Sequence, residues 1–379
     1  MIASQEHIPL FPAPGLIAYD FLFCQGGAEQ LTLELARGLK NADLCVAFRD
    51  RELFTDRVLE GIRCRELGSY PRLSLRAWRT LSGLHVFRRH AGSISDYDWA
   101  LFSGSNAPVA VHHRPGGRNL YYCHTLPRFA YDLHDWYMES LPFWQRPAFR
   151  MLAGYVRSQY EAALARMDTL IANSENVRGR LRHYLGMDSE VIHPPCDVTA
   201  YQWLGQGDYY LSTARLEPYK RVDRIIQAFR HMPDKKLVVA SGGSDENRLR
   251  NLARDAENIR FTGWVGDREL KKLVGTCIAT IYVAKDEDFG MSPVESMAAG
   301  KPVIANAEGG LLETVVNGET GIFVPADPSP TDIADAVREL TAERSQDMRR
   351  ACENRAGLFS RERFLRDMKH TIEQACNWS

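Results

Sequence analysis

Several features that would place a chain in a special class are missing from these 379 residues. The eight cysteines are scattered and form no C-x-x-C pair, which argues against a disulfide framework or a zinc site and favours free thiols in a reducing compartment. No apolar run of 18 or more residues occurs, so we expect no membrane-spanning segment. The first residues, MIASQEHIPLFPAPG, lack a basic stretch followed by an apolar core, so we expect no secretory signal and a cytoplasmic location.

An excess of charge of either sign is also missing. The net charge of −1 argues against nucleic acid as the main partner. Apolar residues make up 45% of the chain and charged residues 25%, as in soluble globular proteins. The length fits two domains of roughly 150–200 residues each.

What is present is an alternation of strand-length apolar runs with amphipathic helical stretches. The expected strands of the first half are 16–23, 44–48, 99–103, 120–123, 167–173 and 191–192. Those of the second half are 209–214, 236–241, 261–265, 279–283 and 303–305. Short connections between strands and helices predict parallel sheets covered on both faces, and hence two doubly wound α/β domains. We place the linker at about 194–207, where Pro and Gly residues interrupt regular structure, which gives domains of 1–196 and 197–359.

The most informative stretch is KDEDFGMSPVESMAAGKPVIANAEGG, residues 285–310. Glu287 and Glu295 bracket a loop that leads into a helix, with Ser292 as its expected cap and Pro293 in its first turn. Free backbone N–H groups at that helix start would form a phosphate site. Alternatively, Glu295 closes a capping box in the S-x-x-E pattern, and Glu287 is a solvated loop acid.

Three further clusters are candidates. Arg215, Lys220 and Arg221 lie between a strand end and a helix start, where cations can converge on a phosphate, although solvated surface is the simpler explanation. Gly26 and Gly27 form a glycine turn after the first strand, which is either a close approach to a ligand or a plain turn.

His124 follows a strand end, where doubly wound folds bind ligands, and Arg128 comes shortly after it. The alternative for His124 is a hydrogen-bonded core residue.

Residues 69–95 contain no acid but five arginines, at 72, 76, 79, 88 and 89, interleaved with Leu73, Trp78, Leu81, Leu84 and Phe87. Such a stretch predicts either a surface helix drawn to anionic lipid or a helix packed on the sheet with solvated arginines. A second aromatic and basic stretch covers 136–157.

The segments EDFGMSPVE and RLEPYKRVD resemble the E-x7-E signature and the diphosphate-binding loop of retaining glycosyltransferases of group 1, family 4. That resemblance implies the GT-B fold: two Rossmann-like domains with the active site in the cleft between them, and a last helix, 360–376, packing back on the first domain. It implies that Glu287 holds the donor sugar, Glu295 the ribose, and Lys220 and Arg215, assisted by Arg221, the departing diphosphate.

The same resemblance assigns further residues to donor and acceptor. The amides of Phe289, Gly290, Met291 and Ser292 would line the sugar and phosphate. Gly243 and Val265 would border the base. Gly26 and Gly27 match the family's GG-x-E turn near the acceptor and the donor phosphate.

The block CHTLPRFAYD resembles a segment of bacterial polysaccharide mannosyltransferases in which the histidine, here His124, lies beside the sugar's primary hydroxyl. It favours GDP-mannose as donor, with a UDP-sugar as alternative. We expect a glycan or polyprenyl-diphosphate-linked acceptor, and the acid-free stretch 69–95 suggests peripheral contact with an anionic membrane at the inner face of the cell. The resemblance also implies front-face transfer with retention, and we expect no metal and no cofactor.

Two other functions remain open: a sugar-nucleotide 2-epimerase of the same architecture, and a two-domain binding protein without catalysis. For the transferase, we expect Lys220→Ala and Glu287→Ala to abolish turnover and leave the fold intact.

Overall fold

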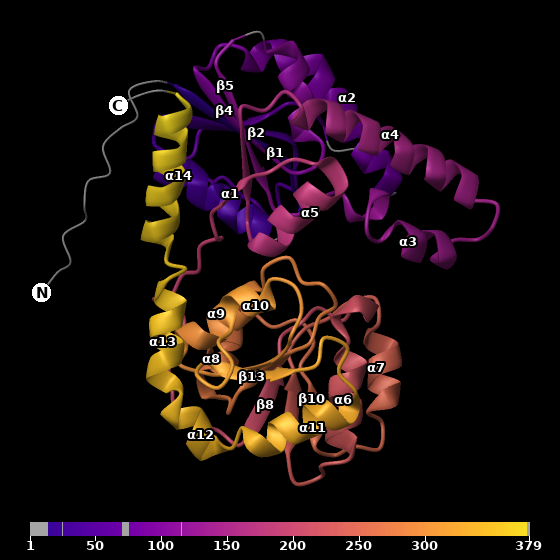
Figure 1. The fold of residues 1–379 in the computed structure, drawn as a ribbon, viewed down its shortest axis with the longest axis vertical. Coiled ribbons are helices and arrows are strands. Elements are labelled where there is room, and N and C mark those ends of the chain that lie inside the picture. The colour runs from indigo at the N-terminus through magenta and orange to yellow at the C-terminus, as the bar shows by residue number, and fades with distance from the viewer. Residues whose placement is uncertain (1–13, 25, 70–75, 115, 377–379) are drawn as a thin grey trace, which may run out of the picture. The chain divides into compact units, whose positions relative to one another are not determined.

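The computed structural model describes residues 14–376 except 25, 70–75 and 115 (Figure 1). The described chain divides into two compact units. The first holds the residues up to Asn173, Val177–Ile192 and those from Leu365 on, and the second holds Ser174–Asn176 and His193–Phe364. Each unit is built on one parallel sheet, so the predicted pair of doubly wound domains is confirmed.

The first unit contains, in its described part, a seven-stranded sheet in the order β3-β2-β1-β4-β5-β6-β7. Its strands are β1 (Gly15–Leu22), β2 (Ala42–Arg49), β3 (Cys64–Glu66), β4 (Trp99–Ser103), β5 (Arg118–Cys123), β6 (Thr169–Ala172) and β7 (Glu190–Val191). Its helices are α1 (Gly27–Gly38), α2 (Arg76–His90), η1 (Ala91–Ile94), η2 (Ala107–His113), η3 (Arg128–Ala130), α3 (His134–Ser140), α4 (Arg146–Leu164), most of α5 (Glu175–Leu185) and most of α14 (Arg361–Ala375).

Strand order reverses beside β1, whose residues are buried along almost their whole length. Just past the middle of β1, the Asp20 carboxylate accepts hydrogen bonds from the backbone amides of Ser105, Asn106 and Ala107 at 2.7 to 2.8 Å. Burial raises the pKa of Asp20 to about 6, against the lowering effect of these three bonds. Asp20 therefore fixes the loop after β4 at the carboxyl edge of the sheet.

Most of the acid-free stretch 69–95 forms helix α2, for which the sequence predicted either a lipid-facing surface or packing on the sheet. Leu84 and Phe87 are buried in the first core, so this face of the helix packs on the sheet. Trp78 and Leu81 lie on the exposed face, with 48% and 37% of their surface accessible. Arg72 and Leu73 of the predicted surface lie outside the described residues.

The second unit contains, among its described residues, a six-stranded sheet in the order β10-β9-β8-β11-β12-β13. The strands are β8 (Tyr209–Ser212), β9 (Lys236–Val239), β10 (Ile259–Phe261), β11 (Thr280–Tyr282), β12 (Val303–Asn306) and β13 (Gly321–Val324). The helices are η4 (Pro218–Lys220), α6 (Val222–Arg230), α7 (Glu246–Leu252), α8 (Asp267–Thr276), α9 (Met291–Ala298), α10 (Leu311–Thr314), α11 (Pro330–Glu339), α12 (Ala342–Asp347) and α13 (Arg349–Gly357).

The segment expected to link the domains packs on the second core instead of running free. Cys196 and Tyr201 are buried there. Lys301, which is fully buried, donates from Nζ to the carbonyl of Gly205 at 2.6 Å and to Gln206 Oε1 at 3.0 Å. Irregular backbone is thus satisfied by hydrogen bonds from a buried cation, as buried polar groups require.

The last helix groups with the first unit from Leu365 on. A Cβ on Gly38 would lie 2.4 Å from Leu365, so α1 and α14 approach each other closely at this glycine. Thr371 donates from Oγ1 to Glu190 at 2.9 Å, beside the edge strand β7. The return of the C-terminus therefore depends on both packing and a hydrogen bond.

Candidate active site

In the second unit, the strand order reverses between β8 and β11, and the loops that follow these two strands meet. The amide of Lys285, in the loop after β11, donates to the carbonyl of Tyr219, in the loop after β8, at 2.8 Å. Ligands of doubly wound sheets bind at such a reversal, outside the carboxyl ends of the strands. The two most informative motifs of the sequence are therefore adjacent in space.

Lys220, Glu287 and Tyr282 form a hydrogen-bonded cluster at this place. Lys220 donates from Nζ to Glu287 Oε2 at 2.5 Å and to Tyr282 Oη at 3.0 Å, and Tyr282 Oη donates to the same carboxylate oxygen at 3.1 Å. Burial disfavours the ammonium, but Glu287 and Tyr282 outweigh it, so the pKa of Lys220 is raised and the side chain stays charged. Two of its three N–H groups are used within the cluster, which leaves one donor for a ligand.

The other two cationic side chains of this loop, Arg215 and Arg221, differ in their partners. Arg215 is exposed, and its side chain makes no ion pair or hydrogen bond with any described residue. Arg221, in the left-handed conformation with φ of 53°, donates from Nη1 to the carbonyl of Ala326 at 2.8 Å and pairs with Asp327 at 3.1 Å. The guanidinium of Arg221 is thus engaged inside the unit, whereas Arg215 is available to a ligand.

The loop that carries Glu287 is held by its backbone. The Glu287 carbonyl accepts from the amide of Gly310 and from Nδ2 of Asn176, both at 2.8 Å, and the Asp288 carbonyl accepts from Ser174 Oγ at 2.6 Å. A Cβ on Gly310 would lie 2.4 Å from the Phe289 backbone, so only glycine permits this approach. Gly310 therefore packs against the loop that carries Glu287.

Helix α9 starts earlier than predicted, at Met291, with Gly290 as its N-cap. Gly290 has φ of 94°, a conformation that glycine adopts without strain. No described side chain caps the helix, so the prediction of Ser292 as cap was wrong, and the capping box through Glu295 is not formed. The first-turn amides, at Met291 and Ser292, are consequently not taken up by a side-chain cap.

The side chain of Phe289 is buried. Its ring stacks on His193 with 5.3 Å between centroids and packs edge-on against Phe359. His193 in turn lies 3.0 Å from the Glu313 carboxylate, which accepts from the amides of Glu175 and Asn176. The phenyl ring therefore anchors the loop, and only its backbone remains available to a ligand.

Glu295 lies apart from the Lys220 cluster in the contacts that the structure records. Burial raises the pKa of Glu295 to about 7, and a hydrogen bond from Tyr201 opposes the shift. Asp267 raises this pKa further, whereas Lys271, which is ion-paired with Asp267 at 2.6 Å, lowers it. The two carboxylates of the E-x7-E motif thus have different environments.

The positions expected beside the base lie at the carboxyl ends of β9 and β10. Gly243 is exposed, and a Cβ there would lie 2.3 Å from the Leu216 carbonyl, so glycine lets the loops after β8 and β9 approach. Val265 is half-buried against the second core. Next to it Trp264 is 71% exposed, and its indole lies so close to Gly242 that a Cβ there would be 2.4 Å away.

Sequence reasoning missed Tyr282. Tyr282 ends a short apolar strand, and only Val283 and Ala284 separate it from the K-D-E segment, so a polar group at that strand end was the available signal.

In the first unit, His124 lies at the end of β5 between two tyrosines. Its ring centroid is 5.1 Å from that of Tyr122 and 6.2 Å from that of Tyr19. Its Nε2 is buried and has no hydrogen-bond partner among the described residues. Burial lowers the pKa of His124 to about 4, so the imidazole is neutral at physiological pH. An unpartnered buried nitrogen at a carboxyl strand end does not fit a satisfied core histidine.

The glycine turn and Arg128 both have partners within the first unit. Gly26 is the N-cap of α1, which begins at Gly27. The space that a Cβ on Gly26 would fill lies 2.7 Å from the Glu29 carboxylate. Arg128 donates from Nε to Asp132 Oδ2 at 2.8 Å, so its guanidinium is held within the first unit.

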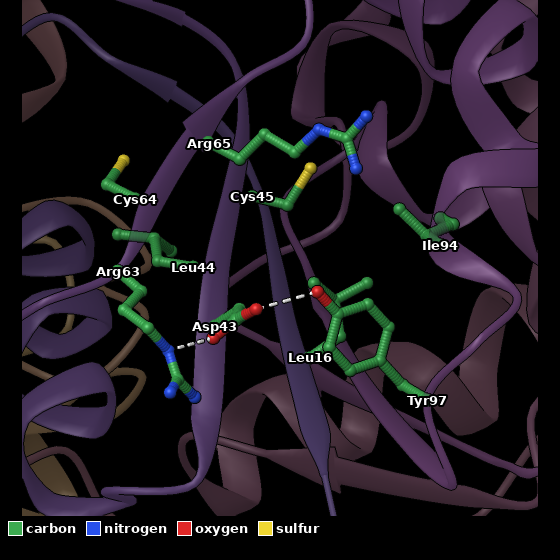
Figure 2. A pocket seen from close by; sticks show the side chains of 9 residues that line it. All are labelled: Leu16, Asp43, Leu44, Cys45, Arg63, Cys64, Arg65, Ile94 and Tyr97. Carbon is green, nitrogen blue, oxygen red and sulfur yellow. Dashed lines mark hydrogen bonds and ion pairs between the residues drawn. The ribbon is translucent and has the colours of Figure 1, made fainter.

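A separate pocket lies at the opposite, amino edge of the first sheet (Figure 2). Arg63 donates from Nε to Asp43 at 2.5 Å, and Tyr97 donates from Oη to the same carboxylate at 2.8 Å. None of the predicted site residues lines it. Within the described part of the chain, no group of three or more His, Cys, Asp or Glu side chains is placed to hold a metal ion.

Two family models match the chain. The model described as glycosyl transferases group 1 matches residues 200–358, and that of glycosyltransferase family 4 matches residues 25–200. The two matches meet at residue 200 and together include every described strand of the two sheets except β1.

Curated relatives match over about half of the chain. A GDP-mannose-dependent alpha-(1-6)-phosphatidylinositol dimannoside mannosyltransferase of Mycobacterium tuberculosis is 29% identical over 196 residues, 50% of each chain. A D-inositol 3-phosphate glycosyltransferase of Corynebacterium aurimucosum is 33% identical over 46% of this chain and 48% of its own. The chain thus spans about half the length of the curated relatives it matches.

Solved structures resemble the whole chain in fold. Sucrose-phosphate synthase from Thermosynechococcus elongatus has a TM-score of 0.75 at 18% identity, covering 96% of this chain and 100% of its own. Anabaena HepE in complex with UDP has a TM-score of 0.70 at 16% identity, covering 95% of this chain and 100% of its own. The fold is therefore of the expected GT-B type, and the chain belongs to the group 1 glycosyltransferases of family 4.

Proposed function

We propose that this chain transfers a hexosyl group from a nucleotide sugar, with mannose from GDP-mannose as the favoured donor, to a lipid-linked or oligosaccharide acceptor. The observation that carries the proposal is the Lys220–Glu287 pair at the β8/β11 reversal. A buried ammonium beside the start of a helix is suited to a diphosphate, and the carboxylate beside it is suited to sugar hydroxyls. The resemblance of RLEPYKRVD implies the first role for Lys220, and that of EDFGMSPVE implies the second for Glu287.

In the proposed reaction, the bond between C1 of the sugar and the β-phosphate oxygen breaks and the nucleoside diphosphate leaves. The acceptor hydroxyl oxygen bonds to C1 from the same face, and its proton passes to the departing phosphate. Negative charge grows on that phosphate, where the third N–H of Lys220, the free guanidinium of Arg215 and the first-turn amides of α9 supply donors. These groups would stabilise the leaving group without a metal ion.

The remaining contacts follow the family resemblance. Glu287 would accept from hydroxyls of the sugar, and Glu295 from those of the ribose. The neutral imidazole of His124 has an unpartnered Nε2 that is able to hydrogen-bond a donor-sugar hydroxyl. The engaged guanidiniums of Arg221 and Arg128 suggest that these two arginines support the site and do not contact the donor.

The donor is proposed on the His124 block and on the M. tuberculosis relative, which is named as GDP-mannose-dependent. Its name also specifies a phosphatidylinositol-linked acceptor, which favours a lipid-linked acceptor here. Among the described residues, no helix has the length and hydropathy of a membrane span. We propose peripheral contact with a membrane on the arginines and the exposed Trp78 and Leu81 of α2.

A panel of nucleotide sugars tests the donor by thermal unfolding. A ligand that binds only the folded chain stabilises it by about 2.7 kcal/mol at a hundred times its dissociation constant. We expect GDP-mannose and GDP to raise the midpoint and UDP-glucose to do so less, with the shift lost in Lys220→Met. A larger shift with a UDP-sugar would replace the donor, and no shift with any nucleotide would refute the proposed function.

Product analysis separates transfer from epimerisation. A transferase releases GDP only as a glycosidic bond forms, whereas a 2-epimerase returns free sugar or a changed nucleotide sugar. Incubation with radiolabelled GDP-mannose and a bacterial lipid extract should move label into the organic phase. Label that stays in nucleotide or free sugar would favour the epimerase.

A further inference from the structure

The strongest unexplained feature lies at the junction of α3 and α4 in the first unit. Five large side chains there are exposed: Trp136, Phe143, Trp144, Met151 and Tyr155, with 45%, 80%, 67%, 77% and 40% of their surface accessible. We call these five residues the aromatic tip. No side chain of α3 is buried, and the buried side chains of α4 begin only at Ala153. Folding therefore leaves this apolar surface in water, where it has no evident structural use.

The aromatic tip is nevertheless fixed to the unit. Phe149 packs against Phe129, His134 and Tyr137 with ring centroids 5.6 to 6.3 Å apart. Arg146 donates from Nε to the carbonyl of Leu141 at 3.1 Å and closes the connection between the helices. Figure 1 shows this connection at the end of α4 that points away from the strands of the first sheet. An ordered projection, rather than a loose loop, thus presents Phe143 and Trp144.

Positive charge borders the aromatic tip. Arg88 of α2 donates from Nη1 to Tyr155 Oη at 2.9 Å, so α2 and α4 lie side by side. Helix α2 contains four arginines and no acid over Arg76–His90, and its exposed face also carries Trp78 and Leu81. The tip's own segment adds Arg150 and carries the acids Asp135 and Glu139. Against a net charge of −1 for the whole chain, this region is locally basic.

Exposed Trp and Phe beside arginines are the combination that proteins use at the surface of a bilayer. The rings enter the boundary between head groups and acyl chains, and the guanidiniums remain with the phosphates. We propose that the aromatic tip inserts into the interface of an anionic membrane, with Phe143 and Trp144 deepest and the basic face of α2 against the head groups. The surface that binds lipid is thus the α3–α4 connection, with α2 as its electrostatic border.

Vesicle binding by the full chain tests this proposal without any donor or acceptor. We expect sedimentation with vesicles of phosphatidylcholine and phosphatidylglycerol, and weak binding to phosphatidylcholine alone. Phe143→Ser combined with Trp144→Ser should lower the partition coefficient by about tenfold or more, because both rings lose their apolar transfer. Leu53→Ser, at an exposed apolar residue of the same unit, is the matched control and should bind like the parent chain.

Arginine variants test the electrostatic contribution to vesicle binding. Arg89→Gln and Arg150→Gln should each weaken binding to the phosphatidylglycerol vesicles by roughly fivefold, as should added salt, with little change on phosphatidylcholine. Brominated lipid should quench the tryptophan emission, and the quenched fraction should fall in Trp144→Phe but not in Trp264→Phe.

Three results would overturn the proposal: no binding to either vesicle, binding that the double variant leaves unchanged, or a self-association in lipid-free solution that the double variant abolishes. Circular dichroism and the GDP-induced midpoint shift show whether each variant is folded. They also separate a failure here from a failure of the proposed transferase, because the shift requires no lipid.

Discussion

Removing one partner of the Lys220–Glu287 pair should affect both stability and turnover. The two side chains are 9% and 16% exposed, and their charged atoms are 2.5 Å apart. Breaking a buried ion pair by removing one partner costs about 3–5 kcal/mol, because the other charge stays buried and unpaired. We expect a loss near the lower end for Glu287→Ala, about 3 kcal/mol, because Tyr282 still accepts from Lys220. We thus expect alanine at this position to destabilise the fold, whereas the sequence alone led us to expect an intact fold.

The matched variant removes both charges. Lys220→Met with Glu287→Gln leaves no unpaired charge, so most of the lost stability should return even though the ion pair is absent. Turnover should stay at least about a hundredfold down in both single variants and in the double variant, because each lacks a group that stabilises the leaving phosphate or holds the sugar. Stability and catalysis are therefore predicted to separate.

Urea unfolding at equilibrium gives the free energies, and release of GDP at a temperature where every variant is folded gives the turnover. The reasoning fails if Glu287→Ala is as stable as the parent chain, or if the double variant is as unstable as the sum of the single ones. Turnover near the parent rate in the double variant would remove this pair from the active site.

Three further predictions concern single groups. His124→Phe should change the free energy of unfolding by less than about 0.5 kcal/mol, because Nε2 has no described partner to lose. It should lower kcat/KM by roughly ten- to a hundredfold, because a hydrogen bond to the donor is missing. An unchanged kcat/KM would show that His124 is a core residue without a role in donor binding. For Glu295, burial raises the pKa to about 7, so the folded chain binds this proton more tightly than the unfolded chain. The free energy of unfolding should therefore fall as the pH rises through 7. In thermal scans from pH 5 to pH 8, Glu295→Gln should make the unfolding midpoint less dependent on pH. For Lys301, burial lowers the pKa from 10.5 to about 8, so the folded chain binds this proton less tightly than the unfolded chain. The free energy of unfolding should therefore decrease as the pH falls through 8. If the unfolding midpoint of Lys301→Met depends on pH as steeply as that of the parent chain, another group titrates.

Much of the fold followed from local patterns in the chain. Apolar runs such as 99–103 and 279–283 appear as the buried strands β4 and β11, because a strand covered on both faces needs apolar residues throughout. The edge strand β3 was not predicted, because Cys64–Glu66 is short and carries charges, as edge strands do. Helix α9 was placed correctly but its first turn was not, because the left-handed Gly290 ends the loop one residue before Met291.

The site could be named from the sequence only as a set of candidates. The resemblance of EDFGMSPVE and RLEPYKRVD to the family's motifs implied nucleotide-sugar chemistry for Glu287, Glu295 and Lys220. Which group each residue faces was not determined, because the partners lie far away along the chain. Glu287 accepts a hydrogen bond from Lys220, 67 positions away in the sequence, and Arg221 donates one to Ala326, 105 positions away.

By itself, then, the sequence determined the two parallel sheets, the loops at their carboxyl edges and the family, because periodicity, turn residues and motif spacing are local properties of a chain. The tertiary structure decided that Lys220 is charged, buried and oriented by Tyr282, that Glu295 has a separate environment, and that the aromatic residues near Trp144 face solvent. Burial and pairing depend on which distant segments pack together, and these fix the pKa values and free donors on which the chemistry depends.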